Sequence, residues 1–153
     1  MQRRKNLETR LGALLAVALV AAPARADPIT IDRLGVVDGD SILVDGREWR
    51  LRGYDTAETV RAYCEGERRL GLIAKRRLEE LIATAKSLEL TGGETADRYG
   101  RPLGSLLVDG RDTGQIMIAE DLARAYEGGR KKGWCSRDSR DDLNGPPVAK
   151  RGR

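Results

Sequence analysis

The sequence predicts an α+β protein in which helices pack on a small β-barrel. Two observations predict this fold. Strand-forming segments between residues 29 and 53 are separated by Asp-Gly dipeptides at 38–39 and 45–46, which favour tight hairpin turns. A meander of three such strands is a common start of a small barrel. Apolar residues then recur at helical spacing over 67–86, which predicts an amphipathic helix packed on the barrel.

The remaining elements follow from the same two periodicities. In chain order, we expect strands over 29–37, 41–44 and 49–53, a helix over 67–86, strands over 88–91 and 103–108, and a helix over 113–125. Beyond Tyr126 the chain becomes rich in Gly, Arg, Lys and Asp. Such a composition buries little apolar surface, so we expect residues 136–153 to form a disordered tail.

The first 26 residues have the three parts of a secretory signal peptide. A basic start precedes an apolar run from Leu11 to Ala22, and Ala24 and Ala26 provide a cleavage site of small residues. The apolar run is too short to span a bilayer comfortably. We therefore expect a signal peptide over 1–26, one domain over 27–135, and a periplasmic or secreted monomer without stable membrane insertion after cleavage.

Charge alone does not indicate the ligand. The whole chain has 28 basic and 24 acidic residues, and removing the first 26 residues leaves 23 of each. The high isoelectric point therefore comes mostly from the signal peptide and is no evidence for nucleic-acid binding. If nucleic acid is the ligand, the positive charge must be local.

Two cysteines, Cys64 and Cys135, both lie in the expected mature chain. Export to an oxidising compartment favours a disulfide between them over two free thiols. With only two cysteines and no histidine, a structural zinc site is not expected.

The absence of histidine also narrows the possible chemistry. Proton transfer near neutral pH must then use a carboxylate or a metal-bound water. Asp38 and Asp45 have a simple explanation as turn residues, but Asp40 follows its turn and contributes nothing obvious to the hairpin. An EF-hand loop is excluded because the third ligand position is Ile42. Arg50 and Arg101, each taken alone, are more simply explained as solvated surface or turn residues.

Three motifs together are more specific than any of these residues alone. They are Val-Asp-Gly-Asp-Ser at 37–41, Arg-Leu-Arg-Gly-Tyr-Asp-Thr-Ala-Glu at 50–58, and Asp-Arg-Tyr-Gly-Arg at 97–101. In order and spacing they resemble the motifs of the thermonuclease (staphylococcal nuclease) family. The resemblance extends from about residue 29 to residue 126. It implies a five-stranded OB-fold β-barrel with packed α-helices, and calcium-dependent hydrolysis of DNA and RNA phosphodiester bonds.

The resemblance also implies roles for individual residues. Asp40, Asp55 and the backbone carbonyl of Thr56 would bind Ca²⁺, Glu58 would be the general base, Arg50 and Arg101 would bind the scissile phosphate, and Arg98 and Tyr99 would contact the nucleotide. These chemical types are suitable, because calcium prefers hard oxygen ligands and guanidinium groups pair with phosphate through two hydrogen bonds. Ala57 departs from the pattern, since the family usually has proline at that position.

Two other functions remain open at this point. The same barrel could bind single-stranded nucleic acid through Tyr99 and nearby arginines without cutting it. A calcium-dependent adhesion or structural module is also possible, but it would leave Arg50 and Arg101 unexplained. The basic triplet at 130–132 fits either a disordered charge run or a phosphate-attracting loop. The sequence does not decide between DNA and RNA, or between endonuclease and exonuclease action.

Overall fold

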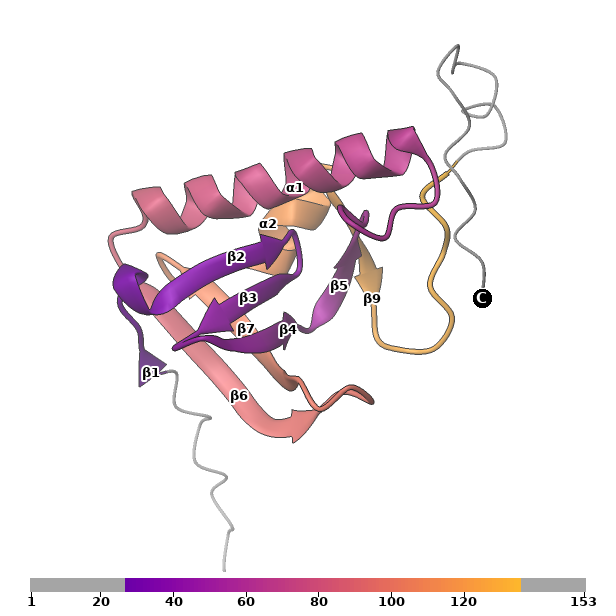
Figure 1. Cartoon of the computed structure of the whole chain (residues 1–153). Helices are drawn as coiled ribbons and strands as arrows, with labels where there is room; N and C mark the ends of the chain where they lie inside the picture. The colour runs from indigo at the N-terminus through magenta and orange to yellow at the C-terminus, as the bar shows by residue number, and fades with distance from the viewer. Residues whose placement is uncertain (1–26, 136–153) are drawn as a thin grey trace, which may run out of the picture.

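The computed structural model describes residues 27–135, so the expected signal peptide and C-terminal tail lie outside the described residues (Figure 1). The strands are β1 (Asp27–Pro28), β2 (Leu34–Asp38), β3 (Ser41–Val44), β4 (Arg47–Leu51), β5 (Gly53–Thr56), β6 (Leu88–Ala96), β7 (Pro102–Val108), β8 (Arg111–Asp112) and β9 (Ala123–Tyr126). The helices are η1 (Ile31–Arg33, a 3-10 turn), α1 (Glu65–Thr84) and α2 (Thr113–Ala119). The α+β class is confirmed.

Seven strands form one mixed sheet and the other two form a separate ribbon. The large sheet has the order β1-β6-β7-β4-β3-β2, with β8 paired to β7, and β5 pairs with β9. Neighbouring strands are antiparallel except β4 and β7, which run parallel. The predicted five-stranded barrel is not confirmed. Five consecutive strands, β6-β7-β4-β3-β2, are present, but within residues 27–135 no ladder closes β2 onto β6.

The predicted meander is present with shifted boundaries. The expected first strand over 29–37 was wrong in its first half, because Ile31–Arg33 form a 3-10 turn and the strand begins at Leu34. The expected third strand over 49–53 is divided. It ends as β4 at Leu51, and β5 begins at Gly53, which has a positive φ of 87° that favours glycine. This break lets β5 leave the large sheet and pair with β9.

Helix α1 confirms the amphipathic prediction, two residues earlier than expected at each end. Cys64 is its N-cap, and the Cys64 sulfur accepts a hydrogen bond from the amide of Glu67 at 3.4 Å. The buried face of α1 includes Ala74 and Leu78, both fully buried, and lies along β2 (Figure 1). These side chains meet the inward residues of the sheet, Ile42, Leu51 and Leu106, in one core.

The predicted helix over 113–125 was wrong in its second half. Helix α2 ends at Ala119, and residues 123–126 form strand β9. Asp112 caps the start of α2 by accepting the amide of Gln115 at 3.1 Å. Asp121 has a φ of 58°, a left-handed conformation that no continuous helix contains. No helix among the described residues combines the length and hydropathy needed to cross a membrane.

Candidate functional site

Two buried carboxylates converge on one guanidinium group at the end of the sheet. Arg50 of β4 donates a hydrogen bond to Asp40 Oδ1 and another, 3.0 Å long, to Asp55 Oδ1. All three side chains are nearly inaccessible, with residue exposures of 8% for Arg50, 2% for Asp40 and 4% for Asp55. Arg50 also donates to the carbonyl of Tyr54 at 3.2 Å. The predicted metal ligands and one predicted phosphate ligand thus form one cluster.

The backbone around Asp40 explains why its side chain turns inward. Asp40 Oδ2 accepts the amide of Thr56 at 2.8 Å, which ties the turn after β2 to the end of β5. Gly39 can approach closely because it has no side chain: a Cβ there would lie 2.8 Å from Ala74 Cβ in α1. Its carbonyl accepts the hydroxyl of buried Tyr54 at 3.2 Å. Strand, turn and helix together therefore fix the position of Asp40.

The surroundings shift the ionisation of Asp40. Burial raises its pKa to about 7, while the positive charge of Arg50 and the amide of Thr56 oppose that rise. A buried carboxylate that retains hydrogen-bond acceptance on both oxygens is a suitable partner for a cation. Proton and cation would compete for the same oxygen atoms.

Glu58 lies in the loop between β5 and α1, and its side chain is 35% exposed. This loop packs directly on α1 at Gly71, where a Cβ would lie 2.6 Å from the carbonyl oxygen of Glu58 and 2.7 Å from that of Ala57. Real Cβ atoms do not approach backbone so closely, so Gly71 permits this contact. The loop with Ala57 in place of proline is therefore supported by the helix beneath it.

The second predicted phosphate ligand, Arg101, precedes β7 at the turn from β6. Its guanidinium pairs with Glu48 at 2.8 Å and with Asp97 at 2.8 Å. It also donates to Ser41 Oγ at 3.4 Å, and that hydroxyl lies 3.3 Å from Asp40 Oδ1. Ser41 therefore connects Arg101 to the buried cluster, and the structure brings both predicted arginines to one end of the sheet.

The predicted nucleotide contacts are on the exposed side of the same turn. Tyr99 is 68% exposed, and the guanidinium carbons of Arg98 and Arg101 lie 5.0 and 5.7 Å from its ring centre. Asp97 organises this turn by accepting the amides of Tyr99 and Arg101 at 2.9 and 3.0 Å. An exposed aromatic ring between two cations can stack on a nucleobase.

The C-terminal part of the described chain contributes residues that the sequence did not identify. Lys131 Nζ lies 2.7 Å from Asp55 Oδ1 and 3.4 Å from Glu58 Oε1. The indole of Trp134 donates to Asp55 Oδ2 at 3.3 Å. Burial lowers the pKa of Lys131, but the hydrogen bond to Asp55 and the negative charges of Asp55 and Asp40 together outweigh burial and the charge of Arg50, so the pKa lies above its usual value. The basic triplet at 130–132 was the signal for Lys131, but nothing in the local sequence identified Asp55 as its partner.

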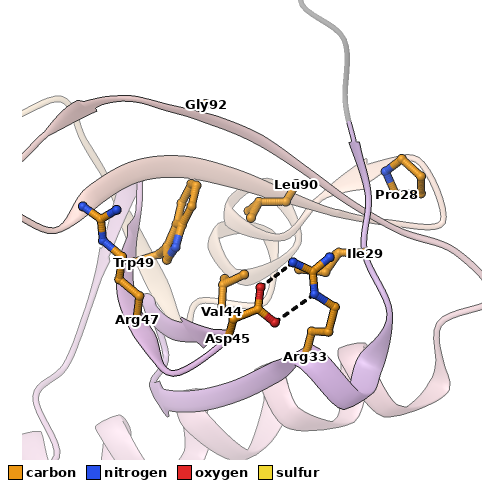
Figure 2. A pocket seen from close by; sticks show the side chains of 9 residues that line it. All are labelled: Pro28, Ile29, Arg33, Val44, Asp45, Arg47, Trp49, Leu90 and Gly92. Atoms are coloured by element: carbon orange, nitrogen blue, oxygen red, sulfur yellow. Dashed lines mark hydrogen bonds and ion pairs between the residues drawn. The ribbon is translucent and has the colours of Figure 1, made fainter.

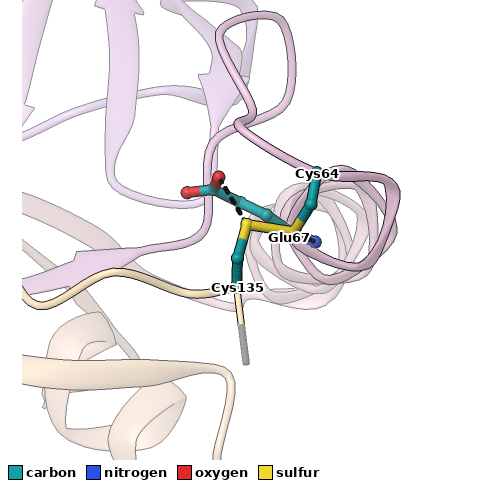
Figure 3. A group of neighbouring side chains, drawn as sticks. All are labelled: Cys64, Glu67 and Cys135. Carbon is teal, nitrogen blue, oxygen red and sulfur yellow. Dashed lines mark hydrogen bonds between the residues drawn. A yellow bond between two sulfur atoms is a disulfide. The ribbon is translucent and has the colours of Figure 1, made fainter. Parts of the chain in front are cut away.

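A disulfide holds this segment in place. Cys64 and Cys135 are bonded, which confirms the predicted pair, and their Cα atoms are 6.1 Å apart (Figure 3). The bond joins the N-cap of α1 to the residue after Trp134. Glu67 lies beside the two sulfur atoms in Figure 3. Because each sulfur is already bonded to the other, this group is a covalent link and not a thiolate metal site.

Of two hollows on the described surface, one borders the site. A hollow of about 420 Å³ is lined by Trp49, Leu90 and the Arg33–Asp45 ion pair, and it contains none of the predicted site residues (Figure 2). A second hollow of about 170 Å³ borders Asp55, and its lining includes the basic residues Arg124, Arg130 and Lys132 together with the acidic Glu127. With three basic side chains against two acidic ones, the second hollow has a small excess of positive charge, which suits a polyanion.

The donor set fits a hard divalent cation. Asp40 and Asp55 provide carboxylate oxygens, and the predicted third ligand, Thr56, directly follows Asp55 in β5 and is buried, with its amide donating to Asp40. Their negative charges are balanced by Arg50 and Lys131, so both carboxylates already bind cationic groups. Oxygen donors with no sulfur or imidazole favour calcium or magnesium over zinc or copper.

Comparisons with known proteins identify relatives of this chain. The chain is 31% identical over 137 residues to Protein ParB of Escherichia coli, covering 82% of this chain and 73% of that protein. It is 35% identical over 107 residues to Endonuclease YncB of Bacillus subtilis (strain 168), covering 63% of this chain and 46% of YncB. It is 36% identical over 107 residues to the SPbeta prophage-derived endonuclease YokF of the same organism, covering 63% of this chain and 33% of YokF. The chain thus spans less than half the length of these two endonucleases.

The sequence model of one family matches residues 48–142, which is well over half of the chain. Its description is staphylococcal nuclease homologue. The match includes every predicted site residue from Arg50 to Arg101, whereas Asp40 lies before it. The chain therefore belongs to the staphylococcal nuclease homologue family.

Proposed function

We propose that the protein is a calcium-dependent nuclease that hydrolyses phosphodiester bonds of DNA, RNA or both. One observation carries this proposal. Asp40 and Asp55 are buried around a single guanidinium, next to Glu58, in a chain whose relatives include two proteins named endonucleases. A protein that only bound nucleic acid would gain nothing from concentrating carboxylates where the phosphates lie.

Asp40, Asp55 and the Thr56 carbonyl would hold the calcium ion. When bound, calcium would neutralise charge on the phosphate and make a nearby water more acidic. Occupation of the site would also give Asp40 and Asp55 a new partner, so the N–H groups of Arg50 could turn to phosphate oxygens. The remaining chemistry would come from this chain's own side chains.

Glu58 would take the proton from the attacking water. The water oxygen forms a bond to phosphorus while the bond from phosphorus to the leaving oxygen breaks, and solvent supplies a proton to that oxygen. Negative charge increases on the equatorial phosphate oxygens during this step, and Arg50 and Arg101 would stabilise it through paired hydrogen bonds. The basic hollow beside Asp55 and the exposed ring of Tyr99 would bind the neighbouring parts of the strand.

We also infer where the protein acts and on what scaffold. The Cys64–Cys135 disulfide and the sequence of residues 1–26 support export to the periplasm or secretion. The five consecutive strands β6-β7-β4-β3-β2, with β4 parallel to β7, support an OB-fold barrel. The monomeric state is part of this proposal.

The test is substrate cleavage by the purified protein with calcium, with magnesium and with excess chelator. Glu58→Gln should lower kcat about 10² to 10⁴-fold with little change in the affinity for a nucleotide, because the amide keeps the shape and loses the base. Glu79→Gln, on the exposed side of α1, is the matched control and should cleave at the normal rate. Full activity in chelator would contradict the calcium requirement.

The same assay separates cleavage from simple binding. If the protein retains a labelled single strand on a filter but cuts neither DNA nor RNA with any divalent cation, it is a binding module. The exposed Tyr99 between Arg98 and Arg101 is the observation that favours this alternative.

A further inference from the structure

Besides Arg50, a second cationic group of the protein lies at the candidate metal site. Lys131 Nζ contacts Asp55 at 2.7 Å and Glu58 at 3.4 Å, so one ammonium group bridges a proposed calcium ligand and the proposed base. Lys131 is still 43% exposed, which leaves its side chain room to move away from Asp55. Asp55 is much more buried, with a side-chain exposure of 6%.

Counting charges shows what this ammonium does. Asp40, Asp55 and Glu58 contribute three negative charges, and Arg50 contributes one positive charge. Without Lys131 the cluster would carry an excess of two negative charges, and two of its three carboxylates, Asp40 and Asp55, are shielded from water. Lys131 reduces this excess to one, and a divalent cation would compensate it in the same place.

The residues that follow Lys131 are held near Asp55 by several contacts. Arg124 of β9 donates to the carbonyl of Gly133 at 3.0 Å, and its guanidinium carbon lies 3.8 Å from the ring centre of Trp134. Trp134 in turn donates to Asp55, and the next residue, Cys135, is bonded to Cys64. A group tethered in this way has a high effective concentration at its target.

We propose that Lys131 is a tethered competitor of the calcium ion, which occupies Asp55 and Glu58 in the metal-free protein and must leave Asp55 when calcium binds. This inference rests on the proposed calcium site. It adds that Lys131 lowers the affinity of that site for calcium. The disulfide strengthens the competition, because it keeps residues 131–134 beside the site. Calcium would therefore both fill the site and release Glu58 from its ion pair.

A structural ion pair would behave differently from a competitor. If Lys131 only anchored the C-terminal segment, its removal would lower stability and leave calcium affinity unchanged. If Lys131 competes with calcium, its removal must raise calcium affinity. The sign of the change in affinity therefore separates the two roles.

The experiment measures metal affinity without any nuclease assay. Terbium(III) takes the same oxygen ligands as calcium and luminesces when a nearby indole transfers energy to it. Trp134 lies 3.3 Å from Asp55, so a terbium ion at Asp55 should be excited through this ring. Calcium displaces terbium, and calorimetry with calcium alone gives an independent dissociation constant.

Lys131→Met should bind calcium about fivefold more tightly than the unchanged protein, which corresponds to one partly exposed ion pair at the upper end of the usual range. Lys132→Met is the matched control. It removes the same charge one residue away, from a side chain with no ion pair in the described part of the chain. Its calcium affinity should change by much less than fivefold.

The Cys64→Ser/Cys135→Ser variant tests the tether. Serine at 64 preserves a good N-cap for α1, and unfolding by urea checks that the variant is folded. In this background, Lys131→Met should have a smaller effect on calcium affinity than in the disulfide-bonded protein. An equal effect in both backgrounds would remove the disulfide from the proposal.

The outcomes distinguish this inference from the function it rests on. Calcium binding with equal affinity in the unchanged protein, Lys131→Met and Lys132→Met would overturn the competitor role and leave the calcium site intact. Equal tightening by both lysine variants would show a general effect of charge and would also overturn it. Failure of all forms to bind calcium or terbium would overturn both proposals.

Discussion

Arg50 and Arg101 are assigned the same role, but they lie in opposite environments. Arg50 is buried, with a side-chain exposure of 10%, between two carboxylates that are themselves buried. Arg101 has a side-chain exposure of 26%, and its partners Glu48 and Asp97 are 40% and 17% exposed. Both guanidinium groups are thus held by acids before any substrate arrives. Only the partners of Arg50 are also the proposed metal ligands.

This difference separates what each arginine does for the fold. A buried charge that loses its partner is costly, whereas exposed ion pairs add little stability. Arg50 should therefore matter for stability and for catalysis, and Arg101 for catalysis alone. Calcium should change the partners of Arg50 directly and affect Arg101 only through Ser41, which links it to Asp40.

The largest expected effect is on the stability of Arg50→Met. Without calcium, at pH 8, the free energy of unfolding should fall by about 3 to 5 kcal/mol, because Asp40 and Asp55 lose their shared buried partner. Adding calcium should restore part of this loss. Urea unfolding with calcium and with chelator measures both effects.

Arg101→Met is the matched control for that measurement. Its free energy of unfolding should fall by no more than about 1 kcal/mol, and calcium should make little difference to the change. Similar losses in the two variants would show that burial does not distinguish the two arginines.

The second prediction isolates the catalytic role of Arg101, on the basis of the proposed function. Arg101→Lys keeps the positive charge but cannot offer the planar pair of donors, so kcat should fall about 10²-fold or more. Arg69→Lys on the exposed face of α1 should leave kcat unchanged. A fully active Arg101→Lys protein would identify Arg101 as a surface residue that binds Asp97 and Glu48.

The smallest effect concerns acid stability at the turn that carries Arg101. Burial opposes ionisation of Asp97, but the amide of Arg101, its guanidinium and the amide of Tyr99 together hold the pKa of Asp97 below its usual value. A depressed pKa contributes stability that is present above the unfolded value of about 3.9 and is lost as the pH falls through the folded value.

Asp97→Asn should remove this contribution. Between about pH 4 and pH 2, the unchanged protein should lose more free energy of unfolding than Asp97→Asn does. Urea titrations at several pH values measure the difference. If the free energies of unfolding of the two proteins fall in parallel over this pH interval, the stability of the turn does not depend on the charge of Asp97.

Much of the fold could be predicted from the sequence because its signals are local. The Asp-Gly dipeptides and the 3.6-residue period of α1 depend on neighbours in the chain. The second half of the expected helix over 113–125 could not be predicted in this way. Residues 123–126 form a strand because they pair with β5, where Asp55 lies opposite Arg124. Because β5 is distant in sequence, the local pattern carries no sign of this pairing.

In the candidate site, too, residues in local motifs could be predicted, and residues that depend on distant contacts could not. The motifs identified Asp40, Arg50, Asp55 and Arg101, and the structure brings these four residues to one end of the sheet. Lys131 and Trp134 were missed because their contacts with Asp55 span 76 and 79 residues, and a charge run carries no information about its partner. Their proximity follows from β9 and from the Cys64–Cys135 link.

Gly71 has a practical consequence for anyone engineering this chain. Replacing a mid-helix glycine by alanine usually raises thermal tolerance, because alanine forms helix more readily by about 1 kcal/mol. At Gly71 the added methyl group would meet the carbonyl oxygens of Ala57 and Glu58 at 2.7 and 2.6 Å. The helix would gain propensity while the neighbouring loop was pushed outward. Propensity-based design should therefore leave Gly71 unchanged, because it positions the loop that carries the proposed base Glu58, and should seek stabilising substitutions on the solvent-facing side of α1.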